Sequence, residues 1–282
     1  MAVGPDGSLY LGERRSGRIL RVAADQLRKR PPGPTAAAGT AATAAAPAVR
    51  AATEVATVVV ATEGQQGLLG LAVEDDGALL VGATVPGPPP HQSLLRIRSG
   101  GGRPEVVWSG VPAVQQAIGG RVAIGADGGV VMGLGSFERD PATPPYGSLL
   151  RLDPTGPADQ APVVLSSGWN NPFAFTVGAD GVLWVADNSP GAVPERFGRG
   201  DGSVRPVDLA GIRAPSGLAE VGPGRFLLCG YVSERLQEVR VAPDGGTQVG
   251  TAVGGCRLGV VALPGGDLAV AGPGGVAIRP AP

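Results

Sequence analysis

Several residue types are rare in this sequence, and their scarcity limits the chemistry that the protein can perform. Lys29 is the only lysine and His91 the only histidine among 282 residues, and there are two cysteines. An essential Schiff-base or phosphate-binding lysine is therefore excluded unless Lys29 itself serves. The patterns HxH, HExxH and CxxC do not occur, so the common zinc-binding motifs are also excluded.

Charge and long apolar runs are scarce as well. Charged residues make up 17% of the chain and the formal net charge is -1, which removes the usual electrostatic case for a nucleic acid or an anionic membrane as partner. One long uncharged stretch, residues 31–49, consists of Ala, Thr, Gly, Pro and Val, and is too weakly apolar to span a bilayer. We interpret residues 31–53 as a low-complexity insert without a role in ligand binding. No signal-peptide pattern follows Met1.

The two cysteines are too few for a disulfide framework. We expect Cys229 and Cys256 to be buried free thiols, since cysteine is among the most frequently buried residue types. A single disulfide between them is the alternative.

Glycine and proline are abundant, with 48 and 28 residues, while 43% of the residues are hydrophobic. This composition disfavours long helices but supplies enough apolar residues for a large β-rich core. Six segments repeat one pattern, in which two apolar runs flank a turn that contains glycine. The turns begin at Asp6, Asp76, Asp127, Asp180, Gly224 and Gly265.

A third apolar run follows most of these hairpins, and a fourth follows several of them. Four antiparallel strands in each repeat of roughly 40 to 50 residues are typical of a propeller blade. The sequence therefore predicts an all-β fold, a single six-bladed β-propeller domain over residues 1–282 with strands a to d in each blade. The chain ends at Pro282 after a third strand, so the last blade lacks its closing strand. We expect that the natural chain starts further upstream and supplies it.

This topology places the d-to-a connections and the b-to-c loops on one face, which we call the top face. Polar side chains that lie in the d-to-a connections should meet there at the mouth of a central channel: Gln65, Gln116, Trp169, Asn170, Asn171 and Arg257. We predict that they bind a small sugar-like ligand, with Trp169 as a stacking surface and the amides as hydrogen-bond partners. In the alternative, the amides merely satisfy loop backbone. His91, in a b-to-c loop, would act as a base only if its loop folded over the mouth.

Several motifs of the chain have close counterparts in one known family. They are EGQQGLLGLA from Glu63, GGRVAIGADG from Gly119, LLRLDP from Leu149 and the pair Asn171-Pro172. These runs resemble, in the same order, GLLGLA, HNGGRLAFGPDG, ILRLDP and GHRNPQG of the soluble sugar dehydrogenases that depend on pyrroloquinoline quinone (PQQ), the glucose/sorbosone dehydrogenase family. The resemblance implies a propeller, the cofactors PQQ and Ca²⁺, oxidation of an aldose, and a secreted or periplasmic location.

The chain departs from the family at the positions that carry the chemistry. The catalytic histidine of the family is matched by Ala117, which cannot accept a proton, and the cofactor-supporting arginine is matched by Asn170. The segment whose carbonyl groups bind Ca²⁺ in the family is matched by residues 187–190, so Asp187, Ser189 and Pro190 are the candidate calcium ligands. Loss of the base predicts that aldose oxidation is absent or very slow.

Three functions remain open from the sequence. The favoured interpretation is a propeller related to the PQQ-dependent dehydrogenases that binds a sugar-like molecule or has become a divergent, impaired enzyme. The first alternative is a Ca²⁺-dependent lactone hydrolase of the gluconolactonase type, with Asn171 and Asp187 among the metal ligands. The second is a scaffold propeller that binds another protein.

Overall fold

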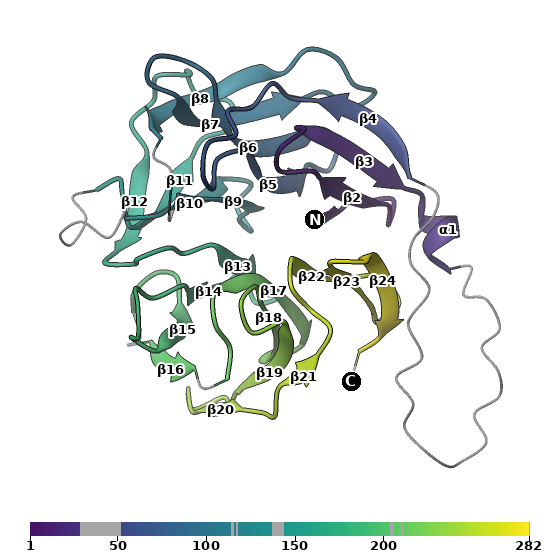
Figure 1. Cartoon of the computed structure of the whole chain (residues 1–282), viewed down its shortest axis with the longest axis vertical. Helices are drawn as coiled ribbons and strands as arrows, with labels where there is room; N and C mark the ends of the chain where they lie inside the picture. Colours follow the sequence, from purple (N-terminus) through teal and green to yellow (C-terminus); the bar gives the residue numbers. More distant parts are fainter. Residues whose placement is uncertain are drawn as a thin grey trace.

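The computed structural model describes residues 1–28, 52–113, 116, 118–136, 144–203, 206–209 and 211–281. Within these ranges the chain forms six small antiparallel sheets arranged around a common centre (Figure 1). The predicted six-bladed propeller is confirmed, including the last blade with three strands. The single helix of the described part is α1 (Ala24–Arg28), and no described helix is long and apolar enough to cross a membrane.

Each blade is one sheet whose strands follow one another in sequence from the centre outward. Blade one consists of β1 (Ala2–Val3), β2 (Leu9–Gly12), β3 (Arg18–Val22) and β4 (Thr53–Thr57). Blade two consists of β5 (Leu68–Val73), β6 (Leu79–Val85), β7 (His91–Ile97) and β8 (Glu105–Pro112). Blade three consists of β9 (Gly119–Ile124), β10 (Val130–Leu134), β11 (Ser148–Leu152) and β12 (Val163–Ser167).

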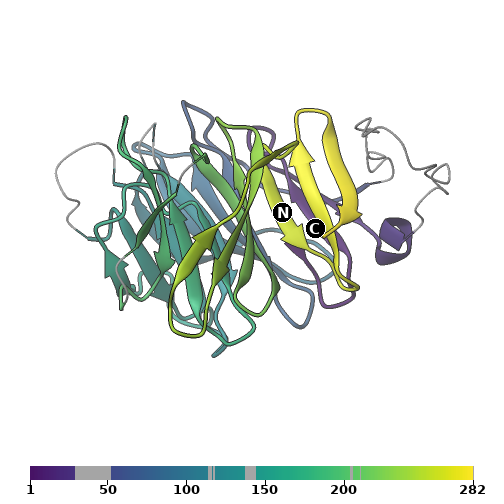
Figure 2. The ribbon, with the colours of Figure 1, turned by 90° about the horizontal axis from the view of Figure 1, so that it is seen from below.

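The second half of the chain repeats this arrangement. Blade four consists of β13 (Ala174–Val177), β14 (Leu183–Asp187), β15 (Glu195–Arg199) and β16 (Val207–Leu209). Blade five consists of β17 (Pro215–Gly222), β18 (Arg225–Gly230), β19 (Arg235–Val241), β20 (Thr247–Val249) and the short β21 (Val253–Gly254), which also pairs with β19. Blade six consists of β22 (Gly259–Ala262), β23 (Asp267–Gly272) and β24 (Gly275–Pro280). The strands of all blades run between the same two faces (Figure 2).

The turns between the two innermost strands follow from their Asp-Gly pairs. In blade three, Asp127 Oδ1 accepts the backbone N–H of Gly129 at 3.0 Å, and Gly128 adopts φ 77°. The same bond, from the residue two positions after the aspartate, occurs at Asp6, Asp76 and Asp180. An aspartate that binds its own turn and a glycine that accepts positive φ therefore set the hairpins of the first four blades.

Apolar side chains hold the blades together face to face. Six buried clusters lie between successive blades, and each draws residues from two of them. Blades four and five, for example, meet at Phe197 and Phe226, with ring centroids 5.6 Å apart. Blades six and one meet in the same manner, through Leu263 and Ala269 on one side and Leu9 and Val22 on the other. The ring is therefore closed by packing between its first and last blades.

Close backbone approach between blades explains the glycines of two family-like motifs. A Cβ atom on Gly70 of β5 would lie 2.3 Å from the carbonyl oxygen of Gly120, and one on Gly82 of β6 would lie 2.2 Å from the same atom. Any side chain at these positions would collide with the next blade, so only glycine fits. The glycines of GLLGLA and GGRVAI thus serve the fold, and their presence says nothing about a cofactor.

The prediction for the cysteines is wrong. Cys229, on β18, and Cys256, just before β22, form a disulfide with a Cα–Cα separation of 5.4 Å, and no free cysteine remains. Both residues are buried between blades five and six. The connection that leads into blade six returns alongside blade five, which brings together two residues that are 27 positions apart. Spacing alone could not reveal this pairing.

The C-terminal boundary of the predicted insert lies near the start of a strand. Residues 31–51 lie outside the described residues, as does Lys29. Thr53, which the sequence interpretation includes in the insert, is the first residue of β4 and pairs with Arg21 of β3. The insert therefore ends before residue 53, because strand pairing with β3 already begins there.

Candidate functional site

The polar residues predicted on the top face are held mainly by blade four. We use the name polar cluster for six residues that bind one another there: Asn170, Asn171, Asp187, Ser189, Glu195 and Arg196. Asn170 and Asn171 lie in the connection before β13, Asp187 ends β14, Ser189 follows in the loop, and Glu195 and Arg196 begin β15. Three separate segments of the chain therefore meet at one end of one blade.

Asp187 organises the cluster. Its side chain is fully buried, and its Oδ1 accepts the backbone N–H groups of Asn170 at 3.1 Å and Asn171 at 2.7 Å. Its Oδ2 forms an ion pair with the guanidinium of Arg196. A buried carboxylate requires such partners, because desolvation otherwise disfavours its charge. The aspartate thus fixes the segment before β13 against the end of β14.

Arg196 joins the same segment from the other side. Its Nη2 donates to the carbonyl oxygen of Gly168 at 3.1 Å, and its guanidinium carbon lies 5.4 Å from the centroid of the Trp169 ring. The indole N–H of Trp169 donates to Ser166 Oγ at 2.9 Å. The cation therefore has a carboxylate, a carbonyl group and an aromatic face as neighbours.

Trp169 is a core residue in this structure. Its side chain is 5% exposed and packs against Val131, Leu149 and Phe175 between blades three and four. The guanidinium of Arg196 lies over the indole ring. The indole therefore offers little open surface, and its predicted stacking on a ligand stays a prediction that would require the ring to be uncovered.

Glu195 forms a second buried carboxylate beside Asp187. Its Oε2 accepts the backbone N–H of Ser189 at 2.6 Å, and its Oε1 accepts that of Ala214, in the connection to blade five, at 2.8 Å. Burial raises the pKa of the Glu195 carboxyl, the two N–H donors oppose this shift, and the nearby charge of Asp187 adds to it. Ala214 adopts φ 52°, an unusual conformation for a residue with a side chain. Glu195 thus fixes the positions of two loops.

The two asparagines connect blade four to its neighbours. Asn171 Oδ1 accepts the backbone N–H of Gly119, at the start of β9, at 3.0 Å. Asn170 Nδ2 donates to the carbonyl oxygen of Asn188, and the N–H of Ser136 donates to the carbonyl oxygen of Asn170 at 2.7 Å. Asn171 is buried, whereas Asn170 keeps part of its surface open. The amides satisfy loop backbone, as the alternative interpretation predicted, and Asn170 still faces solvent in part.

The other predicted ligand residues are not members of the polar cluster. Gln65 and Gln116 are exposed in the connections that lead into blades two and three. Arg257 pairs with Glu234 at 3.1 Å and lies 4.9 Å above the ring of Tyr231, on the side of blades five and six. His91 is the first residue of β7, paired with Val85 and Pro112, and therefore belongs to a strand where we expected a loop.

The candidate calcium ligands already have partners within the chain. The carboxylate of Asp187 carries two N–H groups and a guanidinium. The carbonyl oxygen of Pro190 accepts the N–H of Val193 at 3.2 Å, and the backbone N–H of Ser189 is bound by Glu195. The Oγ of Ser189 is buried without a partner. Among the described residues, no group of three or more His, Cys, Asp or Glu side chains is arranged to hold a metal ion.

Ala117, which matches the catalytic histidine of the family, lies outside the described residues. The prediction that Ala117 leaves the chain without the catalytic base of the family therefore rests on the sequence alone.

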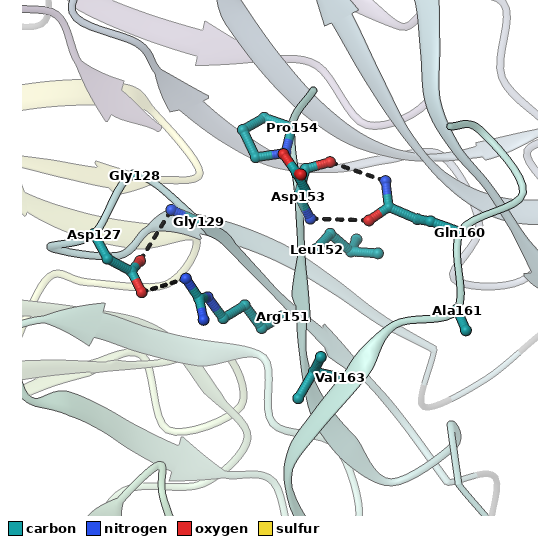
Figure 3. Close-up of a pocket in the computed structure, with 10 residues that line it drawn as sticks. All are labelled: Asp127, Gly128, Gly129, Arg151, Leu152, Asp153, Pro154, Gln160, Ala161 and Val163. Atoms are coloured by element: carbon teal, nitrogen blue, oxygen red, sulfur yellow. Dashed lines mark hydrogen bonds and ion pairs between the residues drawn. The ribbon is translucent and has the colours of Figure 1, made fainter. Parts of the chain in front are cut away.

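Two hollows lie on the opposite face, where the innermost hairpins turn. One, of about 490 Å³, lies at blade three between the Asp127 turn and the loop after β11 (Figure 3). Its polar side chains bind within the hollow: Asp127 pairs with Arg151, and Gln160 binds both backbone groups of Asp153. The other, of about 570 Å³, lies between blades one and two, where Arg21 pairs with Asp6. Neither hollow adjoins the polar cluster.

Sequence reasoning missed the roles of Arg196 and Glu195. Neither residue is among the predicted ligand or metal-binding residues. The signal in the sequence was the pair of opposite charges at the start of a short strand whose next residues, Phe197 and Gly198, are buried. Charged side chains that open a buried strand usually have partners, and here the partners come from two neighbouring connections.

Solved propellers with dehydrogenase names have a similar structure. The aldose sugar dehydrogenase from Streptomyces coelicolor, in its PQQ-bound form, superposes with a TM-score of 0.73 and 21% identity, covering 98% of this chain and 91% of that one. A putative oxidoreductase (glucose dehydrogenase) from Thermus thermophilus superposes with a TM-score of 0.69 and 22% identity, covering 98% and 94%. The resemblance noted in the motifs is thus confirmed for the fold.

A protein with a different activity also resembles the chain. Virginiamycin B lyase from Staphylococcus aureus superposes with a TM-score of 0.57 and 11% identity, covering 98% of this chain and 75% of the lyase. At such identities the similarities show the fold alone. No protein-family model matches the sequence, and no curated protein matches it significantly.

Proposed function

We propose that the protein is a binding propeller that holds a small polyhydroxylated molecule at the top face, beside the polar cluster, without PQQ and Ca²⁺ chemistry. The observation that carries this proposal is the ion pair of Asp187 with Arg196, together with the two backbone N–H groups on the same carboxylate. These contacts stiffen the segment before β13 and place a guanidinium beside residues 187–190, the segment that the family resemblance assigns to a metal.

The residues present do not suit the cofactors of the resembling family. A guanidinium already neutralises Asp187, and a second cation beside it would be repelled. The amide of Asn170, at the position of the cofactor-supporting arginine, carries no charge and donates to Asn188 in its own blade. Ala117 offers no base, and loss of a general base typically costs roughly 10²- to 10⁴-fold in rate. These features favour a binding role over aldose oxidation.

Amide side chains favour a ligand with hydroxyl groups. Gln65, Gln116 and the open part of Asn170 each supply both a donor and an acceptor, which is what hydroxyl groups require. The backbone beneath Asn170 is fixed by Asp187 and by Ser136, so binding a ligand there would order few additional groups. Pre-ordered polar groups of this kind favour a small molecule, and a partner protein remains an outcome of the test below.

We also propose that the protein is secreted or periplasmic. Disulfides persist in oxidising compartments and are rare where thiols are kept reduced. The pair of Cys229 and Cys256 therefore supports a secreted or periplasmic protein, as the family resemblance implies. The near-neutral net charge gives no support to nucleic acid or an anionic membrane as partner.

Calorimetric titration tests the proposed function. D-glucose, D-gluconate and D-glucono-1,5-lactone are titrated into the parent protein, into Asn170→Ala, and into Asp127→Ala on the opposite face. We expect at least one ligand to bind the parent and Asp127→Ala equally and to bind Asn170→Ala more weakly, with melting temperatures as the check on folding. Equal weakening in both variants would contradict the placement on the top face. Absence of binding would favour the scaffold, and calcium-dependent hydrolysis of the lactone would favour the lactonase.

A further inference from the structure

The innermost strands of the propeller are almost free of charge. The six strands β1, β5, β9, β13, β17 and β22 all lie within the described residues, and they carry two ionisable side chains between them, Arg121 and Glu220. Glu220 accepts the backbone N–H groups of Ala179 at 2.6 Å and Gly224 at 3.3 Å, both in turns of the face opposite the polar cluster. Arg121 is the exception that remains to be explained.

Arg121 lies close below the top face. It is the third residue of β9, two positions after Gly119, whose N–H is held by Asn171 of the polar cluster. The neighbouring residues Val122 and Ile124 face the apolar cluster shared with blade two. Arg121 alternates with them along the strand and therefore points away from that cluster.

The guanidinium of Arg121 has no acceptor in the described part of the chain. Its Nε is buried without a hydrogen-bond partner, and no carboxylate pairs with it there. Burial lowers its pKa to about 10. Arg96, Arg151 and Arg225, on the second and third strands of their blades, each pair with a carboxylate, whereas Arg279 on β24 resembles Arg121 in having a buried nitrogen without a partner. An unpaired, partly buried cation costs free energy in the free protein, and an anionic ligand would reduce that cost.

Arg121 lies beside the propeller axis, because β9 is the innermost strand of blade three. Burial lowers the pKa of the Met1 amino group to about 5, and the nearby charge of Arg121 contributes to this shift. Met1 belongs to blade one and Arg121 to blade three, which are separated by blade two. Residues of these two blades come near one another only across the centre of the ring. Arg121 is half-buried there, so solvent reaches part of it.

We propose that Arg121 is an anion-binding residue at the propeller axis, and that the ligand of the top face is a hydroxylated carboxylate such as a sugar acid. This inference rests on the proposed function, which it narrows from hydroxylated molecules to those that carry a carboxylate. The carboxylate would lie against Arg121 below Gly119, and the hydroxyl groups would lie toward the exposed amides. Among the described inner strands no other charge is unpaired, so no anion of these strands competes with a ligand for the guanidinium.

A charged and a neutral ligand with matched hydroxyl groups test the contribution of the carboxylate to affinity separately from that of the hydroxyl groups. D-gluconate and D-sorbitol are open-chain molecules with the same hydroxyl configuration from C2 to C5 but differ in charge, and each is titrated calorimetrically into the parent, Arg121→Met, Arg121→Lys and Arg98→Met. Arg98, whose side chain is 75% exposed, is the matched control because it lies on the outer part of blade two. We expect Arg121→Met to weaken gluconate by about 10- to 100-fold, the size expected for a charge-assisted hydrogen bond. Arg121→Lys should lose less, and Arg98→Met nothing.

The melting temperature distinguishes a folding defect from the loss of a ligand contact. Arg121→Met removes an unpaired buried charge and keeps a side chain of similar length, so its melting temperature should equal or exceed that of the parent. A lower melting temperature together with unchanged gluconate affinity would show a structural role and overturn the inference.

Failure of this inference can be told apart from failure of the proposed function. If gluconate and sorbitol bind the parent equally, and Arg121→Met changes neither affinity, the anion site is wrong while the hydroxylated ligand stands. If neither of them binds the parent, the proposed function fails, and malonate then serves as a plain carboxylate probe. Malonate binding that is lost in Arg121→Met would support the anion site by itself. Malonate binding that is absent, or independent of Arg121, would overturn it.

Discussion

The fully buried carboxylate of Asp187 pairs with the guanidinium of Arg196, which lies 5.4 Å from the centroid of the Trp169 ring. Through this pair, two successive strands of blade four and the connection from blade three are joined at the top face. The contact places a protein cation where the family resemblance predicts a metal site.

Removal of the cation should destabilise the protein. Arg196→Ala leaves the Asp187 carboxylate buried with backbone N–H donors alone, and loss of one partner of a buried ion pair typically costs about 3–5 kcal/mol. Denaturant unfolding measures the change. Arg98→Ala is the control, since its pair with Glu105 is exposed to solvent and should contribute little. Equal stability of the two variants would contradict the structural role given to Arg196.

A methyl group at the interface of blades two and three should be poorly tolerated. The Cβ of Gly70→Ala would lie 2.3 Å from the carbonyl oxygen of Gly120, so the blades would have to move apart. Overpacking of this kind costs about 1–3 kcal/mol or more. Gly254→Ala is the matched control, because no heavy atom lies within 4 Å of the added carbon. Thermal unfolding of the two variants should differ clearly, and an unaffected Gly70→Ala protein would show that the blades are not so closely packed.

The disulfide should contribute measurably to stability. Reduction, or the double variant Cys229→Ala with Cys256→Ala, should lower the free energy of unfolding by about 2–4 kcal/mol. A reducing agent should lower the melting temperature of the parent and leave that of the double variant unchanged. If the parent reacts with a thiol reagent after denaturation without reduction, the cysteines are free and the disulfide is absent.

The pH dependence of stability should carry a contribution from Glu195. Burial raises the pKa of its carboxyl in the folded protein, so between the ordinary and the raised value the folded state binds a proton that the unfolded chain does not. Stability from this group is therefore present at acid pH and is lost as the pH rises through the raised pKa. Glu195→Gln should remove that contribution, so the difference in melting temperature between parent and variant should change across this range. A constant difference would contradict the shift.

The sequence was sufficient to predict the blades because each repeat carries its own local signals. Asp127 and Gly128 set a turn by themselves, and the alternation of Val130 and Met132 against Val131 shows which residues face each neighbouring blade. Hairpin signals of this kind depend on a few adjacent residues, so they can be read without the fold.

The polar cluster could be predicted only in part, because its bonds join distant segments. The topology brought Asn170, Asn171 and Asp187 to one face, as expected. It could not reveal that Arg196 would neutralise Asp187, nor that Trp169 would be covered, because both depend on side-chain packing across connections. Arg121 belongs to the GGRVAIGADG motif. Its buried Nε lacks a hydrogen-bond partner, which the sequence could not predict because it depends on the residues of the surrounding strands.

A titration of the pure protein with PQQ in the presence of Ca²⁺ tests the central claim most directly. The quinone absorbance reports binding whether or not any sugar is oxidised. Because Arg196 already neutralises Asp187, and Asn170 donates to its own blade, we predict no saturable change in the quinone spectrum and no dependence on calcium. A stoichiometric, calcium-dependent shift would contradict the account and restore PQQ as the cofactor of this propeller.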